Sequence, residues 1–309
     1  MKKKTKIIFS ALIIIVLLIS GGLLYGGNYL YNLALNPNTD KSVVFDNKDT
    51  QNKQEFEKVE NTLLEDQGSD VYLENDSLKL HSYLLNQNSD TWVITVHGYT
   101  GQASDLSNIA NEFYQRGYNI LAPDLRGHGQ SEGDYIGMGW DDRLDILAWI
   151  DYLNQNYNFP DIILYGISMG AATVMNVSGE DLTENVKFVI EDCGYTSTWD
   201  IFAYQLNSLF NLPAHPFLDV ANLVTKIKAG YTFNHGPINQ IQKCQIPILF
   251  IHGNQDTFVP SKMVDILYEK AACPKEKLII EGAGHGQSKD TNPDLYWRVI
   301  DEFIRKYLN

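Results

Sequence analysis

Residues 166–170 have the sequence GISMG and join two segments of opposite character. The β-rich run Ile162–Tyr165 comes before them, and the helix-forming run Ala171–Ser178 follows. Glycines on both sides of Ser168 permit a sharp, strained turn that lifts the serine hydroxyl above a sheet. The first N–H groups of the helix also lie beside that hydroxyl. The pattern therefore predicts a strand–turn–helix unit with Ser168 as a nucleophile.

Strand-like and helix-like segments alternate from about residue 70 to the end of the chain. The predicted strands are Val71–Glu74, Leu78–Leu85, Trp92–His97, Tyr118–Ala122, Ile162–Tyr165, Lys187–Glu191, Ile246–Ile251 and Lys277–Glu281. The predicted helices are Asp105–Gln115, Trp140–Asn156, Ala171–Ser178, Lys262–Ala272 and Asp294–Leu308. Such alternation predicts an α/β fold with a mostly parallel, eight-stranded sheet covered by helices on both faces. The first two strands have no helix between them, which predicts an antiparallel hairpin at the sheet edge.

The connection between Asp192 and Ile246 is much longer than a turn. It is rich in aromatic residues and leucine, and Pro213 and Pro216 interrupt it. We expect a small helical cap at about residues 196–244, above the strand ends where sites of such sheets lie.

The first 35 residues are predicted to form a membrane anchor. No charged residue occurs from Ile7 to Thr39, and Ile7–Gly26 is almost wholly apolar. A helix of about 20 residues spans about 30 Å, the thickness of the hydrocarbon core. The basic cluster Lys2–Lys6 is expected to stay in the cytoplasm, which places the rest of the chain outside. This predicts a single-pass protein of the cell membrane with an extracellular domain.

A cleaved signal peptide is the alternative, because the densest apolar stretch, Ile7–Ile19, has a signal-like length. The small residues after it form no clear A-x-A cleavage site, which favours an uncleaved signal-anchor.

Residues 36–69 are polar and are predicted to be a tether, with the folded domain at 70–309. Phe56, Val59 and Leu63 recur at helical spacing, which predicts a short amphipathic helix over Lys53–Glu65. No predicted strand or motif lies in residues 1–35. We therefore expect their deletion to leave a soluble and active domain.

The charge excludes one class of partner. Lys and Arg total 24 against 38 acidic residues, and without the four N-terminal lysines 20 remain against 38, a net charge of −18. Such a surface repels a phosphate backbone, so nucleic acid is not an expected partner. Cys193, Cys244 and Cys273 lie far apart with no CxxC pattern, which argues against a structural zinc site and a disulfide scaffold.

A nucleophilic serine needs a base, and the base needs an orienting acid. His285 lies in a glycine-rich loop just past the last predicted strand, and Asp256 follows the strand Ile246–Ile251 by a short turn. The chain order Ser168, Asp256, His285 is that of nucleophile-elbow hydrolases. These three residues are the predicted catalytic triad.

An oxyanion hole needs main-chain N–H groups aimed at the developing charge. The N–H of Met169 follows the nucleophile directly, and we assign the second donor to Tyr99, in the loop after Trp92–Val96. Since that role belongs to the main chain, the Tyr99 side chain is free to line an acyl pocket.

With these motifs in place, the chain resembles the α/β-hydrolase superfamily. Within it, the resemblance is to membrane-associated bacterial hydrolases near the serine-aminopeptidase-like and monoacylglycerol-lipase-like groups. The matching segments are His97-Gly98, residues 124–131 (DLRGHGQS), 166–170 (GISMG), 252–256 (HGNQD) and 284–286 (GHG). The resemblance covers about residues 70–309. It implies the α/β-hydrolase fold, an acyl-enzyme intermediate and no cofactor or metal, but no particular substrate.

Other polar residues near strand ends are expected to be structural. Asp124 and Arg126 are predicted to pair with each other, and His97 and His252 to pack and hydrogen-bond. Cys193 is expected to be a small buried residue. The cap aromatics are mostly expected in the core, with one or two touching substrate: Trp199, Phe202, Tyr204, Phe210 and Phe217.

The sequence predicts hydrolysis of a carboxylic ester, on a small-molecule or peptide acyl substrate; a thioester or an amide also fits. The alternative is a peptidase or amidase, which would need a carboxylate cluster in the cap, where only Asp200 and Asp219 occur. The non-enzymatic alternative is an inactive surface-binding module, and an intact triad argues against it.

Overall fold

The structure, a computed structural model, describes residues 2–45 and 62–308. The predicted helix at Lys53–Glu65 lies largely outside the described residues. From Thr62 the chain is described again and begins the short helix α3 (Leu63–Gln67).

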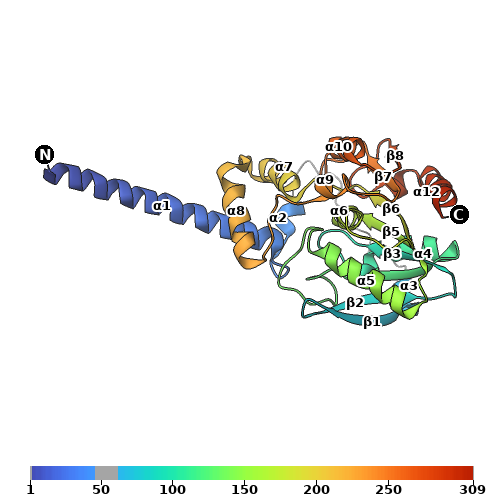
Figure 1. The fold of residues 1–309 in the computed structure, drawn as a ribbon. Helices are drawn as coiled ribbons and strands as arrows, with labels where there is room; N and C mark the ends of the chain where they lie inside the picture. Colours follow the sequence, from blue (N-terminus) through green and yellow to red (C-terminus); the bar gives the residue numbers. More distant parts are fainter. Residues whose placement is uncertain (1, 46–61, 309) are drawn as a thin grey trace.

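An eight-stranded sheet forms the centre of the molecule. Its strands are β1 (Ser69–Asn75), β2 (Leu78–Leu85), β3 (Thr91–Val96), β4 (Asn119–Pro123), β5 (Asp161–Ile167), β6 (Val186–Asp192), β7 (Ile248–Gly253) and β8 (Lys275–Ile280). Their order is β1-β2-β4-β3-β5-β6-β7-β8 (Figure 1). β2 is antiparallel to both of its neighbours, and the other pairings are parallel. The predicted fold class is confirmed, including the hairpin at the sheet edge.

Helices cover both faces of this sheet. They are the 3-10 helix η1 (Ala103–Leu106) with α4 (Ser107–Gln115), α5 (Asp142–Asn156), α6 (Met169–Val177), α10 (Lys262–Lys270), α11 (Ser288–Thr291) and α12 (Pro293–Tyr307). The core under α5, α6 and α10 lies on one face, and the core under α3, α4 and α12 lies on the other. Strands β3, β4 and β7 are buried along their whole length because both of their faces are covered.

Three helices lie in the long connection between β6 and β7, where the cap was predicted. They are α7 (Thr198–Phe210), α8 (Ala214–Lys228) and α9 (Pro237–Gln240). α8 lies across the N-terminal helix at the end of the domain, as Figure 1 shows.

The N-terminal helix α1 (Lys2–Leu35) projects from the domain, and the short α2 (Ser42–Phe45) follows it (Figure 1). Its segment Lys6–Leu35 is long and apolar enough to cross a membrane. The side chains from Ile7 to Ile19 are exposed, whereas Tyr31, Leu33 and Leu35 are buried in the domain.

The end of α1 is firmly seated on the domain. A Cβ on Gly27 would lie 2.6 Å from Val220 Cγ1, so α8 approaches the helix backbone closely at that point. The Leu35 carbonyl accepts the Ile136 N–H at 2.8 Å. The Lys41 ammonium donates to the carbonyl of Asn36 at 2.6 Å, which satisfies a main-chain group at the helix end.

This packing is a reason to expect, contrary to the sequence analysis, that deleting all of residues 1–35 destabilises the domain. Leu35 is fully buried in the main core, and Tyr31 and Leu33 are nearly so. A membrane span needs only about 20 residues, and the uncharged run from Ile7 is longer than that. The last residues of this run, which include Tyr31, Leu33 and Leu35, pack against the domain.

Candidate active site

The turn between β5 and α6 holds Ser168 in a strained conformation. Its φ and ψ are 55° and −115°, a region that costs a non-glycine residue about 1–3 kcal/mol. A Cβ on Gly166 would lie 2.2 Å from the Gly170 carbonyl oxygen, and one on Gly170 would lie 2.0 Å from that of Val96. Only glycine fits at these two positions. The serine hydroxyl is therefore presented at the strand end, as the GISMG pattern predicts.

The structure brings Ser168, His285 and Asp256 together. His285 follows β8 and Asp256 follows β7, so both reach the same edge of the sheet as Ser168. The Ser168 hydroxyl lies 2.8 Å from His285 Nε2, and His285 Nδ1 lies 2.7 Å from Asp256 Oδ2. With Nδ1–H donating to the carboxylate, Nε2 has the lone pair that can accept the serine proton.

Asp256 is held as an anion. Its Oδ1 accepts the N–H groups of Phe258 and Val259 at 2.9 and 2.8 Å. Burial alone would raise the pKa of this carboxyl, but His285 and His252 hold that pKa well below its usual range. The carboxylate can therefore orient the imidazole and stabilise its cation.

His252 is a neighbour of the triad that the sequence analysis assigned only to packing and hydrogen bonding. Its Nε2 lies 2.9 Å from the Val259 carbonyl and 3.2 Å from Asp256 Oδ2. Burial opposes its cation, yet contact with Asp256 raises the pKa of His252. His252 lies four residues before Asp256, in the segment HGNQD. That spacing was the signal that could have predicted its contact with the Asp256 carboxylate.

The loop after β3 lies against the nucleophile. A Cβ on Gly98 would be 3.4 Å from Ser168 Cβ. The neutral ring of His97 holds this loop, because its Nε2 accepts the Leu125 N–H at 3.0 Å and its Nδ1 donates to the Gly98 carbonyl at 2.8 Å. Burial lowers the pKa of His97, which favours that neutral form. Tyr99, whose main-chain N–H is the predicted oxyanion donor, follows Gly98 in this loop.

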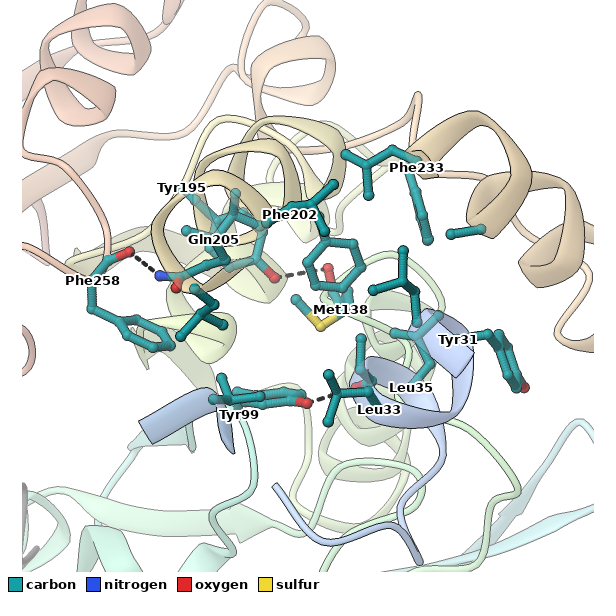
Figure 2. Close-up of a pocket in the computed structure, with 18 of the residues that line it drawn as sticks. Tyr31, Leu33, Leu35, Tyr99, Met138, Tyr195, Phe202, Gln205, Phe233 and Phe258 are labelled. Carbon is teal, nitrogen blue, oxygen red and sulfur yellow. Dashed lines mark hydrogen bonds between the residues drawn. The ribbon is translucent and has the colours of Figure 1, made fainter. Parts of the chain in front are cut away.

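An apolar cavity has Ser168 in its lining. Figure 2 shows other residues that line it. Phe202, Leu206 and Phe233 from the cap region line it. Figure 2 shows Phe202 and Phe233 on one side and the Tyr99 ring opposite. Two polar groups in its lining are engaged within the protein: the Gln205 amide donates to the Phe258 carbonyl at 2.7 Å and the Tyr195 hydroxyl to the Met138 carbonyl at 3.0 Å. The cavity therefore suits an apolar group.

The end of α1 supplies another wall of this cavity, which the sequence analysis missed. Leu30, Leu33 and Leu35 line it, and the hydroxyl of Tyr99 donates to the Ala34 carbonyl at 2.7 Å. Figure 2 labels Leu33 and Leu35 near the Tyr99 ring. The signal for this role was the apolar run beyond the length of a membrane span.

The predicted pair between Asp124 and Arg126 is wrong. Asp124 instead contacts His81 Nδ1 at 2.8 Å and accepts the N–H groups of Ala103 and Gln130. The Arg126 guanidinium binds both carboxylate oxygens of Asp145 in α5, at 2.7 and 2.8 Å. Arg126 is buried, and its two parallel hydrogen bonds to Asp145 are the geometry that guanidinium groups prefer.

The described residues include one cluster with potential metal ligands, Cys193, Asp256 and His285, whose ligand atoms lie within 4.8 Å of one another. Two of its members already bind each other. Burial raises the pKa of the Cys193 thiol well above its usual value, which disfavours the thiolate that would be needed as a ligand or nucleophile.

Known proteins resemble this chain. A family model for serine aminopeptidase, S33, matches residues 87–191. The uncharacterized protein YqkD of Bacillus subtilis is 31% identical over 214 residues, which cover 69% of this chain and 70% of its own length. Protein bem46 of Schizosaccharomyces pombe is 23% identical over 245 residues, covering 74% of this chain and 73% of its own.

Solved structures share the architecture. The esterase Pf2001 of Pyrococcus furiosus has a TM-score of 0.66 at 25% identity, covering 80% of this chain and 93% of that chain. Est1E from Butyrivibrio proteoclasticus, solved with ferulic acid, has a TM-score of 0.60 at 21% identity, covering 77% and 98%. The second likeness concerns the fold alone.

Proposed function

We propose a reaction for this chain, which belongs to the α/β-hydrolase superfamily and is a hydrolase. In this proposal, Ser168, His285 and Asp256 cleave a carboxylic ester with an apolar acyl group. The observation that carries this proposal is the apolar cavity that has Ser168 in its lining. Hydrogen-bond distances within the three residues support their roles.

In the proposed mechanism, His285 takes the proton of Ser168 as the serine oxygen attacks the acyl carbonyl carbon. The N–H groups of Met169 and Tyr99 stabilise the oxyanion of the tetrahedral intermediate. The protonated His285 then gives its proton to the leaving alcohol, and an acyl-serine ester remains. Water, deprotonated by His285, releases the acid and restores the serine.

A peptidase that binds a free amine would need a carboxylate near the nucleophile. Asp200 instead accepts the hydroxyls of Thr196 and Ser197, at 2.6 and 2.7 Å. Asp219 is exposed and pairs with His215. Neither of these carboxylates lines the cavity, which favours an ester over a peptide with a free N-terminus.

The test is fluorophosphonate labelling of the full-length protein, followed by a panel of p-nitrophenyl esters and aminoacyl-anilides. Wild type should label and cleave esters, and Ser168→Ala should do neither. Cys193→Ala is the matched control, since its thiol lies beside His285, and this variant should still label. Faster cleavage of the anilides would favour the peptidase, and an unlabelled, inactive wild type would favour a binding module.

We also propose that α1 crosses the cell membrane once, from Lys6 to about Gly26, with the catalytic domain outside. The exposed apolar side chains of this segment and the lysines before it support that orientation. Protease added to intact cells should then remove the domain. A full-length gene product found only in the culture fluid would indicate a cleaved signal peptide instead.

A further inference from the structure

The end of α1 is both the continuation of the proposed membrane span and a wall of the cavity. Large apolar side chains of α1 are exposed up to Leu24 and Tyr25, and Tyr29 is still half exposed on one side of the helix. The first buried residue of α1 is Gly27. Leu30, the first residue of α1 that lines the cavity, is only four residues beyond Gly26. That interval corresponds to about 6 Å along a helix axis. A domain seated in this way stays against the membrane surface.

The cap helix α8 has a membrane-compatible outer face beside α1. Leu223 and Ile227 are 50% and 75% exposed, and Lys226 and Lys228 are exposed beside them. Apolar side chains mixed with lysines are typical of a helix that lies among lipid headgroups. The rest of the chain is strongly acidic, so this basic, apolar face stands out. Figure 1 shows α8 at the end of the domain from which α1 projects.

Leu218, Ala221 and Leu206 from the cap line the cavity together with Leu30 and Leu33 from α1. The cavity therefore lies between α1, which continues from the proposed membrane span, and α8, whose outer face is proposed to lie on the membrane surface. Figure 2 shows Leu33 and Leu35 of α1 facing the space above the Tyr99 ring.

We propose that the end of α1 is part of the acyl-binding site, and that the substrate is a fatty acyl ester embedded in the same membrane, whose chain reaches Ser168 between α1 and α8. This inference rests on the proposed esterase function. An acyl chain that moves from the bilayer into this cavity stays in apolar surroundings throughout. A substrate taken up from water would not need a binding site beside the membrane span.

The test of the cavity wall uses the full-length protein in phosphatidylcholine vesicles, with p-nitrophenyl acetate and p-nitrophenyl dodecanoate. Leu30→Trp fills the cavity from the α1 side. It should lower kcat/KM for the dodecanoate about tenfold and for the acetate less than about twofold. Leu24→Trp is the matched control, because Leu24 is on the exposed part of α1, and it should change neither value.

Equal losses on both esters would mean that the end of α1 only supports the fold, and no loss on either would mean that it does not bind the chain. Both results would overturn the inference while ester hydrolysis by wild type still upheld the proposed function.

Leu30→Ala should shift the preference toward longer chains. Binding of a dansyl-labelled undecanoyl ester to full-length Ser168→Ala tests the wall without turnover, and adding Leu30→Trp should weaken that binding about tenfold.

The test of the access path uses Ile227→Glu on the outer face of α8. This change should lower turnover of the vesicle-embedded dodecanoate at least about fivefold and leave the soluble acetate unchanged, because a carboxylate is repelled from the headgroup region. Ile266→Glu on α10 is the matched control, since Ile266 is exposed away from α1. Equal effects of the two variants would overturn access along α8.

Discussion

The hydroxyl of Tyr99 donates a 2.7 Å hydrogen bond to the main-chain carbonyl of Ala34. This bond joins the loop after β3 to the last turn of α1. The Tyr99 ring lines the cavity, and its main-chain N–H is the proposed oxyanion donor. One residue thus connects the N-terminal helix, the acyl site and the loop beside Ser168.

Tyr99→Phe should lower kcat for p-nitrophenyl esters about three- to tenfold, which corresponds to the typical worth of one hydrogen bond, about 0.5–1.5 kcal/mol. The ring remains, so KM should change little. Tyr195→Phe is the matched control: its hydroxyl also donates to a carbonyl at the cavity, that of Met138, which lies outside the loop after β3. Similar kcat losses in the two variants would contradict a positioning role for the Tyr99 hydroxyl.

Asp256→Asn and His285→Ala should each lower kcat by about 10³-fold or more, with Ser168→Ala at least as severe. The double variant Asp256→Asn/His285→Ala should be little slower than His285→Ala alone, because residues that act as one unit are not additive. Single-turnover ester assays on folded full-length protein measure this. Losses that multiply would show that Asp256 and His285 work independently.

Much of the fold follows from local sequence patterns. All eight strands were predicted because buried parallel strands are short apolar runs between turn signals, and the helices between them have clear periodicity. Ser168 was predicted because glycine is required on both sides of the turn. Asp256 and His285 were predicted because each follows a strand, and the ends of parallel strands meet at one edge.

The remaining features depend on contacts between distant segments. Whether Arg126 pairs with Asp124 or with Asp145 is decided by how closely α5 approaches the loop after β4, which no local pattern specifies. The role of Leu30 and Leu33 depends on where the helix meets the cap. In the sequence, these leucines continue an apolar run that already satisfies the requirements of a membrane span.

Glu191 should make folding stability depend on pH. Its side chain is fully buried, its Oε2 accepts the Gly194 N–H at 3.0 Å, and burial raises its pKa to about 8 from 4.5. Between these two pH values, the unfolded chain has lost this proton and the folded chain still holds it. The contribution of Glu191 to the free energy of unfolding is therefore largest below pH 4.5, and it falls by about 1.4 kcal/mol per pH unit as the pH rises toward 8.

Glu191→Gln keeps an acceptor for Gly194 and removes the ionisation. The variant should unfold at nearly the wild-type temperature at pH 4.5 and at a higher temperature than wild type at pH 8. Thermal unfolding of both full-length proteins across this range measures the difference, since all other titrating groups are shared. Parallel curves for the two proteins would show that Glu191 ionises equally in the folded and unfolded states.

Two truncations separate the membrane span from the part of α1 that belongs to the domain. A form that begins at Gly27 keeps Tyr31, Leu33 and Leu35, so it should stay folded and cleave soluble short esters. A form that begins at Asn36 loses these three buried side chains. Removing one buried leucine side chain costs about 2–5 kcal/mol, and a whole domain is stable by only about 5–15 kcal/mol. The shorter form should therefore aggregate or unfold at least about 10 °C lower, and lose its activity.

Unfolding temperature, solubility and p-nitrophenyl acetate turnover are measured side by side for both forms. If the two forms were equally stable and active, residues 27–35 would contribute nothing to the domain, and the wall of the cavity would have to be sought elsewhere.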